Sequence, residues 1–271
     1  MPTIEFNGTG GLMEGDFGTA DINVNLDAIY STVGNAGSAN YISATHTVPA
    51  TGNWSISWWG REDSPSPANY TYHVGNGGGG GGLGWGSLTD TSDNYLRFEI
   101  MPTGDGSRPA VYLVGDNSGG GAGSTAISKI YVRDGSWHHY AVSVDRSGDM
   151  IGYFDGIQAD VVDVSADDGE TLAGASTIKI LDNNQNFTGE VADVRIFSDI
   201  ITGDEVKVLA SKININTALG PGTANLTNCW AISGDVDGTI NDTGSGADNG
   251  SVSGSLTTKY DAFSVNAQDT V

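Results

Sequence analysis

One stretch of the chain, residues 134–156, has the pattern of a β-hairpin closed by tight turns. Side chains alternate in character over Trp137–Val144 with a period of two, which is the period of a β-strand. The turn residues Asp145–Gly148 follow, and a second run ends at the turn-forming pair Asp155-Gly156. The hairpin therefore predicts an antiparallel sheet. The two faces of its first strand are expected to carry His138, Tyr140, Val142 and Val144 on one side, and Trp137, His139, Ala141 and Ser143 on the other.

Further alternating runs predict that the rest of the chain is also built of strands. Glycine accounts for 41 of the 271 residues, about twice its usual share, which fits many turns between short strands. Thr202 and Glu205 have the spacing of a capping box and predict one short helix. The apolar faces of the strands are expected to pack across two sheets. These faces comprise Trp54, Ile56 and Trp58; Leu96, Phe98 and Ile100; Val111 and Leu113; Ile178 and Ile180; and the strand 191–197.

Four segments together resemble a known family. In chain order they are residues 39–43, residues 52–59, the hairpin at 134–156, and residues 188–197. They resemble, in the same order, the strands of the laminin-G-like, concanavalin A-like lectin and glucanase family, and the resemblance covers about residues 38–212. It implies an all-β fold, a concanavalin A-like (laminin-G-like) jelly-roll β-sandwich. One departure is Ala192, which stands where the family often has an acidic residue.

The resemblance divides the chain into three parts. Residues 1–37 are expected to form an N-terminal arm, which either adds a strand or packs on a neighbouring chain. Residues 38–212 form the jelly-roll sandwich, and residues 213–271 form a C-terminal extension. Within the extension, residues 228–254 resemble the family's opening strand, although they follow its last strand. Three alternatives stay open for this segment: a truncated second domain, a permuted strand that completes the sheet, or a strand that docks on a neighbour.

The charge of the chain argues against two classes of partner. Its 33 acidic and 11 basic residues give a net charge of −22. Nucleic acids and anionic membranes both attract basic proteins, so neither partner is expected. No stretch reaches the roughly 18 apolar residues of a membrane helix, and the first residues lack the pattern of a signal peptide. Cys229 is the single cysteine, so no disulfide within the chain is possible.

The sequence also argues against catalysis. Hydrolases of the related fold carry the motif E-x-D-x-x-E on one strand, and retaining glycosidases need two carboxylates about 5–5.5 Å apart. Here Glu190 is followed by Ala192 at the middle position and Arg195 at the last. Asp193 is expected to point to the opposite face. The neighbours His138 and His139 are expected on opposite faces of a strand and cannot chelate one metal ion. No enzyme activity is predicted.

Two kinds of ligand are compatible with the resemblance. Exposed aromatic rings stack on sugars, and the candidates for carbohydrate binding are Trp59, Tyr70, Tyr72 and Trp85. The alternative is that the tryptophans mainly fill the sandwich core. Many laminin-G-like domains bind calcium, which prefers oxygen ligands. The candidate calcium ligands are Asp155, Asp182, Asn183 and Asn184, although such groups also arise by chance in an acidic chain.

The function that we predict from the sequence is that of a non-catalytic virion structural protein. It would be a bacteriophage capsid decoration (cement) or tail-associated protein, assembled in the host cytoplasm and located in the virion. Its partners would be the major capsid protein or another virion protein, further copies of itself as a homo-oligomer, and a host-surface glycan. The alternative is a free or secreted carbohydrate-binding lectin module in an extracellular location. A glycoside hydrolase is the third and least favoured hypothesis.

Overall fold

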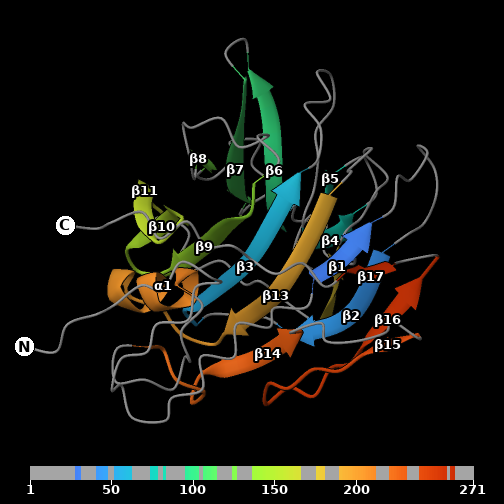
Figure 1. The fold of residues 1–271 in the computed structure, drawn as a ribbon. Helices are drawn as coiled ribbons and strands as arrows, with labels where there is room; N and C mark the ends of the chain where they lie inside the picture. The colour runs from blue at the N-terminus through green and yellow to red at the C-terminus, as the bar shows by residue number, and fades with distance from the viewer. Residues whose placement is uncertain are drawn as a thin grey trace, which may run out of the picture.

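The computed structural model describes residues 28–31, 41–47, 52–62, 74–78, 82–83, 95–103, 106–114, 124–126, 136–165, 175–180, 189–211, 220–230, 238–254 and 257–259. These residues form three antiparallel sheets and one α-helix, α1 (Gly203–Ala210) (Figure 1). This arrangement confirms the predicted all-β fold. Within the described ranges, no helix has the length and apolar character needed to cross a membrane.

The first sheet contains the predicted hairpin. Its strand order is β11 (Ile157–Asp163), β10 (Asp149–Phe154), β9 (His138–Val144), β3 (Trp54–Glu62), β13 (Gly189–Phe197), β1 (Ala28–Ser31) and β17 (Thr257–Lys259), and β14 (Leu226–Trp230) also pairs with β13. β9 and β10 pair from Val144↔Met150 to Tyr140↔Phe154, which confirms the hairpin and its register. Asp155 and Gly156, with φ angles of 50° and 80°, then turn the chain into β11. This left-handed backbone explains the Asp-Gly pair, since both residue types tolerate it.

The second sheet faces the first across the main core. Its order is β15 (Thr239–Ile240), β16 (Gly250–Ser253), β2 (Tyr41–Thr47), β12 (Ala175–Ile180), β4 (Val74–Gly78) and β5 (Gly82–Leu83). Trp54, Ile56 and Trp58 are buried together in this core, as their shared face predicts. Trp58 stacks on Tyr140 with the ring centroids 5.4 Å apart. Each fully buried side chain of this kind contributes about 1.5–3 kcal/mol, so the core holds the two sheets together.

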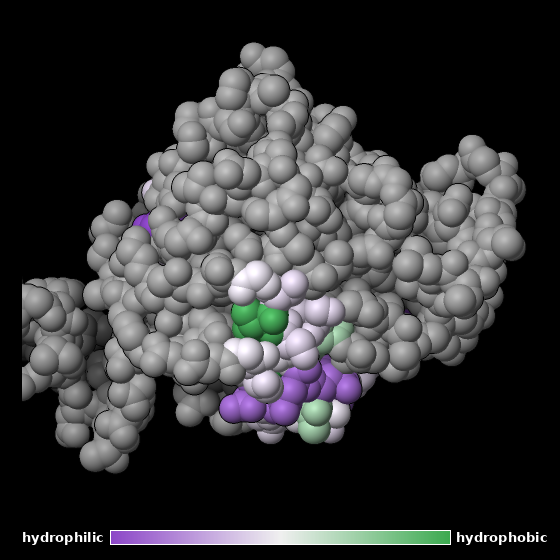
Figure 2. Space-filling view, turned by 90° about the vertical axis from the view of Figure 1, so that its right-hand side faces the viewer, coloured by the Kyte–Doolittle hydropathy of each residue, from purple (hydrophilic) through white to green (hydrophobic). Residues whose placement is uncertain are grey.

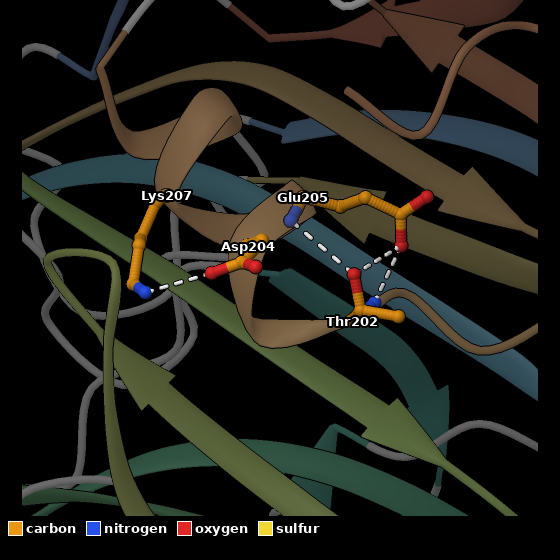
Figure 3. A network of polar contacts seen from close by, with 4 residues as sticks. All are labelled: Thr202, Asp204, Glu205 and Lys207. Atoms are coloured by element: carbon orange, nitrogen blue, oxygen red, sulfur yellow. Dashed lines mark hydrogen bonds and ion pairs between the residues drawn. The ribbon is translucent and has the colours of Figure 1, made fainter. Parts of the chain in front are cut away.

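The helix α1 covers part of the outer face of the first sheet. Thr202 accepts a hydrogen bond from the Glu205 amide, and Glu205 accepts from the Thr202 amide, so the predicted capping box is confirmed (Figure 3). Ser55 fixes the approach to the helix, because its hydroxyl donates to the Asp199 carbonyl oxygen at 2.8 Å and accepts from the Ile201 amide at 3.0 Å. Val206 and Leu209 then pack on the sheet, in a second core with Phe197, Tyr153 and Leu226.

The C-terminal segment contributes to both sheets. β14 pairs with the end of β13, from Val194↔Trp230 to Phe197↔Leu226, and β16 pairs with β2. Trp230 is fully buried in the main core. At the outer edge of the second sheet, β15 is only two residues long. Figure 2 shows that the described part of this side of the molecule is a hydrophilic strip beside a small hydrophobic patch. So short an edge strand offers few backbone groups for pairing with other chains.

The third sheet differs from the sequence prediction. β6 (Tyr95–Thr103) and β7 (Gly106–Val114) pair along their whole length as a hairpin, and β8 (Ser124–Ala126) joins the outer side of β7. We expected the apolar faces of these runs to pack between the two main sheets. Their strands form a separate three-stranded sheet instead. A hairpin register satisfies the alternation equally well, and the pattern alone does not distinguish the two arrangements.

Candidate functional site

The candidate site lies on the outer face of the first sheet, where β13 contains a β-bulge. Its pairing with β3 shifts register between Ala192 and Arg195, and Asp193 has a φ angle of 51°. Val191 and Val194 both contribute to the main core although they are three residues apart. Asp193 is therefore the extra residue of the bulge, and both Ala192 and Arg195 lie on the outer face.

The bulge brings Asp193 and Arg195 together as a largely buried ion pair. Arg195 Nη2 lies 2.8 Å from Asp193 Oδ2, and the two side chains are 16% and 7% exposed. The prediction that Asp193 points to the opposite face was wrong, because it assumed an unbroken period of two. Burial is the largest single influence and lowers the pKa of Arg195, but the charges and hydrogen bonds of Asp193 and Cys229 together outweigh it, so the pKa is raised. The pair stays charged and neutralises itself.

Cys229 on β14 completes this group. Its thiol lies within hydrogen-bonding reach of Arg195 and is buried. Burial raises the pKa of the thiol, and the charge of Asp193 raises it further. A thiol with a raised pKa is a poor nucleophile, since the thiolate is the reactive form. Cys229 is therefore a core residue that packs with Phe197 and Leu226.

The same strand carries the positions of the hydrolase motif. Backbone pairing sets Glu190 opposite Arg61 of β3, and Ala192 opposite Trp59. Ala192 provides a methyl group where the motif has its middle acid, and Arg195 provides a guanidinium group where it has its last acid. Those two positions hold no carboxylate that could act with Glu190 as an acid–base pair. The bulge therefore holds a buried ion pair at the place where hydrolases of the fold hold a pair of catalytic carboxylates.

An aromatic cluster adjoins the bulge. Trp59 packs against Ala192 and Trp137, and its ring meets that of His139 edge to face at 5.3 Å. Trp59 is only 6% exposed. The ring is therefore not exposed as the sequence analysis expected, because Ala192, Trp137 and His139 pack against it. A role of Trp59 in carbohydrate binding stays a prediction. The other predicted carbohydrate-binding residues, Tyr70, Tyr72 and Trp85, lie outside the described residues.

Trp137 is the aromatic residue of this cluster that the sequence analysis did not select. Its side chain is half-buried, and the Arg61 guanidinium carbon lies 5.7 Å from the centre of its ring. That distance is typical of a cation–π contact. Its position at the predicted start of β9, where a strand leaves a loop, is the signal that could have identified it.

Asp155 is the one predicted calcium ligand that the structure describes. Its Oδ2 lies 2.8 Å from His138 Nδ1, and its Oδ1 accepts a hydrogen bond from the His139 amide at 2.8 Å. His138 also stacks on Phe154, with the ring centroids 4.6 Å apart. Both oxygens of Asp155 thus hold the β10–β11 turn against the start of β9. Its geometry fits this structural role better than calcium binding.

The remaining predicted calcium ligands, Asp182, Asn183 and Asn184, lie outside the described residues. Among the residues that the structure does describe, no three His, Cys, Asp or Glu side chains form a group that could hold a metal ion. Calcium binding stays a prediction.

Comparison with known proteins agrees with this architecture. The sequence profile of the concanavalin A-like lectin/glucanases superfamily matches residues 35–207, more than half of the chain. A native heptameric SAP-like pentraxin from Limulus polyphemus has a similar fold, with a TM-score of 0.59 and 14% identity over 88% of this chain and 96% of the pentraxin.

A protein from Bacteroides ovatus named for carbohydrate binding is also similar, with a TM-score of 0.53 and 17% identity. The match covers 87% of this chain but spans only 60% of the Bacteroides protein. No curated protein sequence matches the chain. From the profile match and the antiparallel sandwich, we conclude that the chain belongs to the concanavalin A-like lectin/glucanase superfamily.

Proposed function

We propose that the protein is a non-catalytic binding module with a lectin-like fold. The observation that carries this proposal is the bulge of β13, where Arg195 pairs with Asp193 at 2.8 Å. At this point hydrolases of the fold need a second carboxylate, and the chain supplies a buried guanidinium that its own neighbour neutralises. A fold that keeps its sandwich and lacks the acid pair is suited to binding. Recombinant protein should release no sugar from polysaccharide substrates, and measurable hydrolysis would contradict this.

The biological setting that we propose is a virion. In this setting the protein is a bacteriophage capsid decoration or tail-associated protein, and its partners are the major capsid protein and further copies of itself. The support is the analogy with jelly-roll modules on phage surfaces. The net charge of −22 is also compatible with an exterior location, because it disfavours contact with the packaged genome.

Quantitative mass spectrometry of gradient-purified particles tests the virion proposal. We expect this chain in a fixed ratio to the major capsid protein. Hundreds of copies in each particle support a capsid decoration protein, and a handful support a tail or vertex component. Absence of the chain from particles overturns the virion setting and leaves the lectin-like module itself untouched.

A free glycan-binding lectin is the second candidate. The half-buried ring of Trp137 beside Arg61 favours it, since a ring of this kind can stack on a sugar. A glycan array with wild type, Trp137→Ala and the matched control Ile157→Ala tests it, because Ile157 is 69% exposed on the edge strand β11. Loss of a glycan signal only in W137A, with folding intact, supports the lectin. Absence of any glycan signal in the wild type would contradict the lectin hypothesis.

A calcium ion held by Asp182, Asn183 and Asn184 belongs to either form of the proposal. We expect EDTA to lower the melting temperature of the wild type, because bound cations stabilise only the folded state. An unchanged melting temperature would mean that the folded protein holds no stabilising calcium ion.

A further inference from the structure

Strand β11 is an edge strand of the first sheet. Within the described ranges it pairs only with β10, and β8, which comes close to it, is hydrogen-bonded to β7. Figure 1 shows β11 at the margin of the fold, beside β10 and α1. Its seven residues are enough for a further strand to pair with, because the outer edge of such a strand presents backbone donors and acceptors.

The same strand also carries exposed apolar side chains. Ile157 is 69% exposed and Val161 is 40% exposed. Among the described residues, Ile200 is the only other large apolar side chain that is exposed. An exposed apolar edge strand is a favourable place for another chain to pair. The sequence of β11 therefore needs a feature that controls this pairing.

Asp160 occupies one of the outward backbone groups of this edge. The Val164 amide donates to the Gly148 carbonyl oxygen at 2.8 Å, so it points toward β10. Amides at alternate positions of a strand point to opposite sides, and the Val161 amide therefore points to the outer edge. There it donates to Asp160 Oδ1 at 2.9 Å. A strand that is added at this edge has to displace the carboxylate to reach this amide.

The charge of Asp160 opposes one partner above all, the same strand of a second copy. Asp160 is the middle residue of the seven in β11. A two-fold antiparallel pair that overlaps both strands fully therefore sets Asp160 opposite Asp160 of the second copy. Like charges directly opposite each other in a sheet are destabilising. In the same register Asp163 would lie opposite the apolar Ile157, which adds no favourable pair.

We propose that Asp160 protects the open edge of β11 from pairing with β11 of a second copy. Its carboxylate acts in two ways, because it occupies the outward amide of Val161 and because it meets its own copy across the two-fold axis. The edge is a latent interface that this one side chain keeps closed. A homo-oligomer of this protein then forms through a different surface.

The variant Asp160→Ala removes both effects, and Asp199→Ala is its matched control. Asp199 is exposed in the loop before α1, and its Oδ1 accepts from the Ile200 amide at 2.8 Å. The control therefore loses the same charge and the same kind of hydrogen bond outside the strand. In sedimentation velocity, D160A should associate at least about tenfold more tightly than the wild type or D199A. Hydrogen exchange should show that protection of residues 157–163 rises with protein concentration in D160A alone.

Three results would overturn the proposal: protection of residues 157–163 that already rises with concentration in the wild type, a D160A variant that associates no more than the wild type, or an equal gain in D199A. If circular dichroism shows that D160A does not fold, Asp160→Asn decides, because it keeps an acceptor for the Val161 amide and removes only the charge. Protection of residues 157–163 in D160N must then rise with concentration, and unchanged protection overturns the proposal. None of these outcomes depends on glycan binding or on the virion setting.

Discussion

Replacing Asp242 with alanine is expected to release the C-terminal strand β14 from the sandwich. The Asp242 carboxylate accepts four hydrogen bonds, at 2.6 Å from Asn228 Nδ2, 2.7 Å from the Cys229 amide, 2.8 Å from the Gly244 amide and 2.9 Å from the Asp248 amide. Two of these donors belong to β14 and are buried, and the other two belong to the loop that follows Asp242. One side chain thus fastens the strand to its loop.

The expected cost follows from the two buried donors. A hydrogen bond to a charged group contributes about 1.5–3 kcal/mol, and a buried donor left without a partner costs a similar amount. Water can replace the carboxylate at the Gly244 and Asp248 amides, which are only half-buried. Counting only the two buried donors, we expect D242A to lower the free energy of unfolding by about 4 kcal/mol. That is a large part of the roughly 5–15 kcal/mol of a typical domain.

Urea unfolding followed by tryptophan fluorescence measures this loss. Asp248→Ala is the matched control, because it removes a carboxylate from the same loop. The Asp248 side chain is 3.4 Å from Asn228 Nδ2, and its backbone carbonyl, which accepts from Trp230 Nε1 at 2.9 Å, is kept. With an m-value of about 3 kcal/mol/M, D242A should lower the midpoint by roughly 1.3 M, whereas D248A should lower it by less than about 0.3 M.

The reasoning fails if D242A and D248A unfold at the same urea concentration with the m-value of the wild type. It also fails if hydrogen exchange of the β14 amides in D242A stays as slow as in the wild type. Either result would mean that pairing with β13 holds the strand and that the carboxylate adds nothing to it.

Three further changes test other parts of the structure. Thr202→Ala removes the side-chain cap of α1 and should lower stability by about 1 kcal/mol in urea unfolding; a loss below about 0.3 kcal/mol would contradict the role of the cap. Asp155→Asn tolerates the same left-handed backbone but replaces the carboxylate that contacts His138 Nδ1 and the His139 amide, so it should lower stability by about 1 kcal/mol in urea unfolding. A loss below about 0.3 kcal/mol would show that these contacts do not hold the turn. Native Cys229 should not react with a thiol reagent until the protein unfolds. Because its folded pKa is raised, the stability that it contributes is complete below the unfolded pKa of about 8.5 and falls as pH rises above it; rapid modification of the native protein would contradict its burial.

The parts of the fold that the sequence predicted are those that depend on neighbouring residues. The β9–β10 hairpin, the shared face of Trp54, Ile56 and Trp58, and the capping box at Thr202 all follow from local spacing. Period-two alternation and a cap are physical requirements of the element itself, so they are visible before any tertiary contact is known.

The candidate site could not be predicted in the same way. The bulge at Asp193 leaves no sign in the local pattern, yet it places Ala192 and Arg195 on one face and pairs Arg195 with Asp193. Whether Trp59 is exposed depends on what covers the outer face of the sheet, including Trp137, which lies 78 residues away in sequence. Alternation distinguishes the two faces of a strand but does not say whether a face is covered.

The C-terminal strand shows why the order of strands along a chain is a weaker constraint than their order in space. β13 pairs with β3 along one edge, whereas the other edge is shared by β1 near Val191 and β14 from Val194 onward. The first and last described strands, β1 and β17, are themselves paired, with Ala28 opposite Lys259. Segments from both ends of the described chain thus meet at one edge of the sheet. Where the first and last described strands pair in this way, an opening strand can move to the other end of a domain without changing any pairing, since the hydrogen bonds depend on adjacent strands and not on the loops that connect them. The resemblance of residues 228–254 to an opening strand and their position after α1 are therefore compatible within one sandwich.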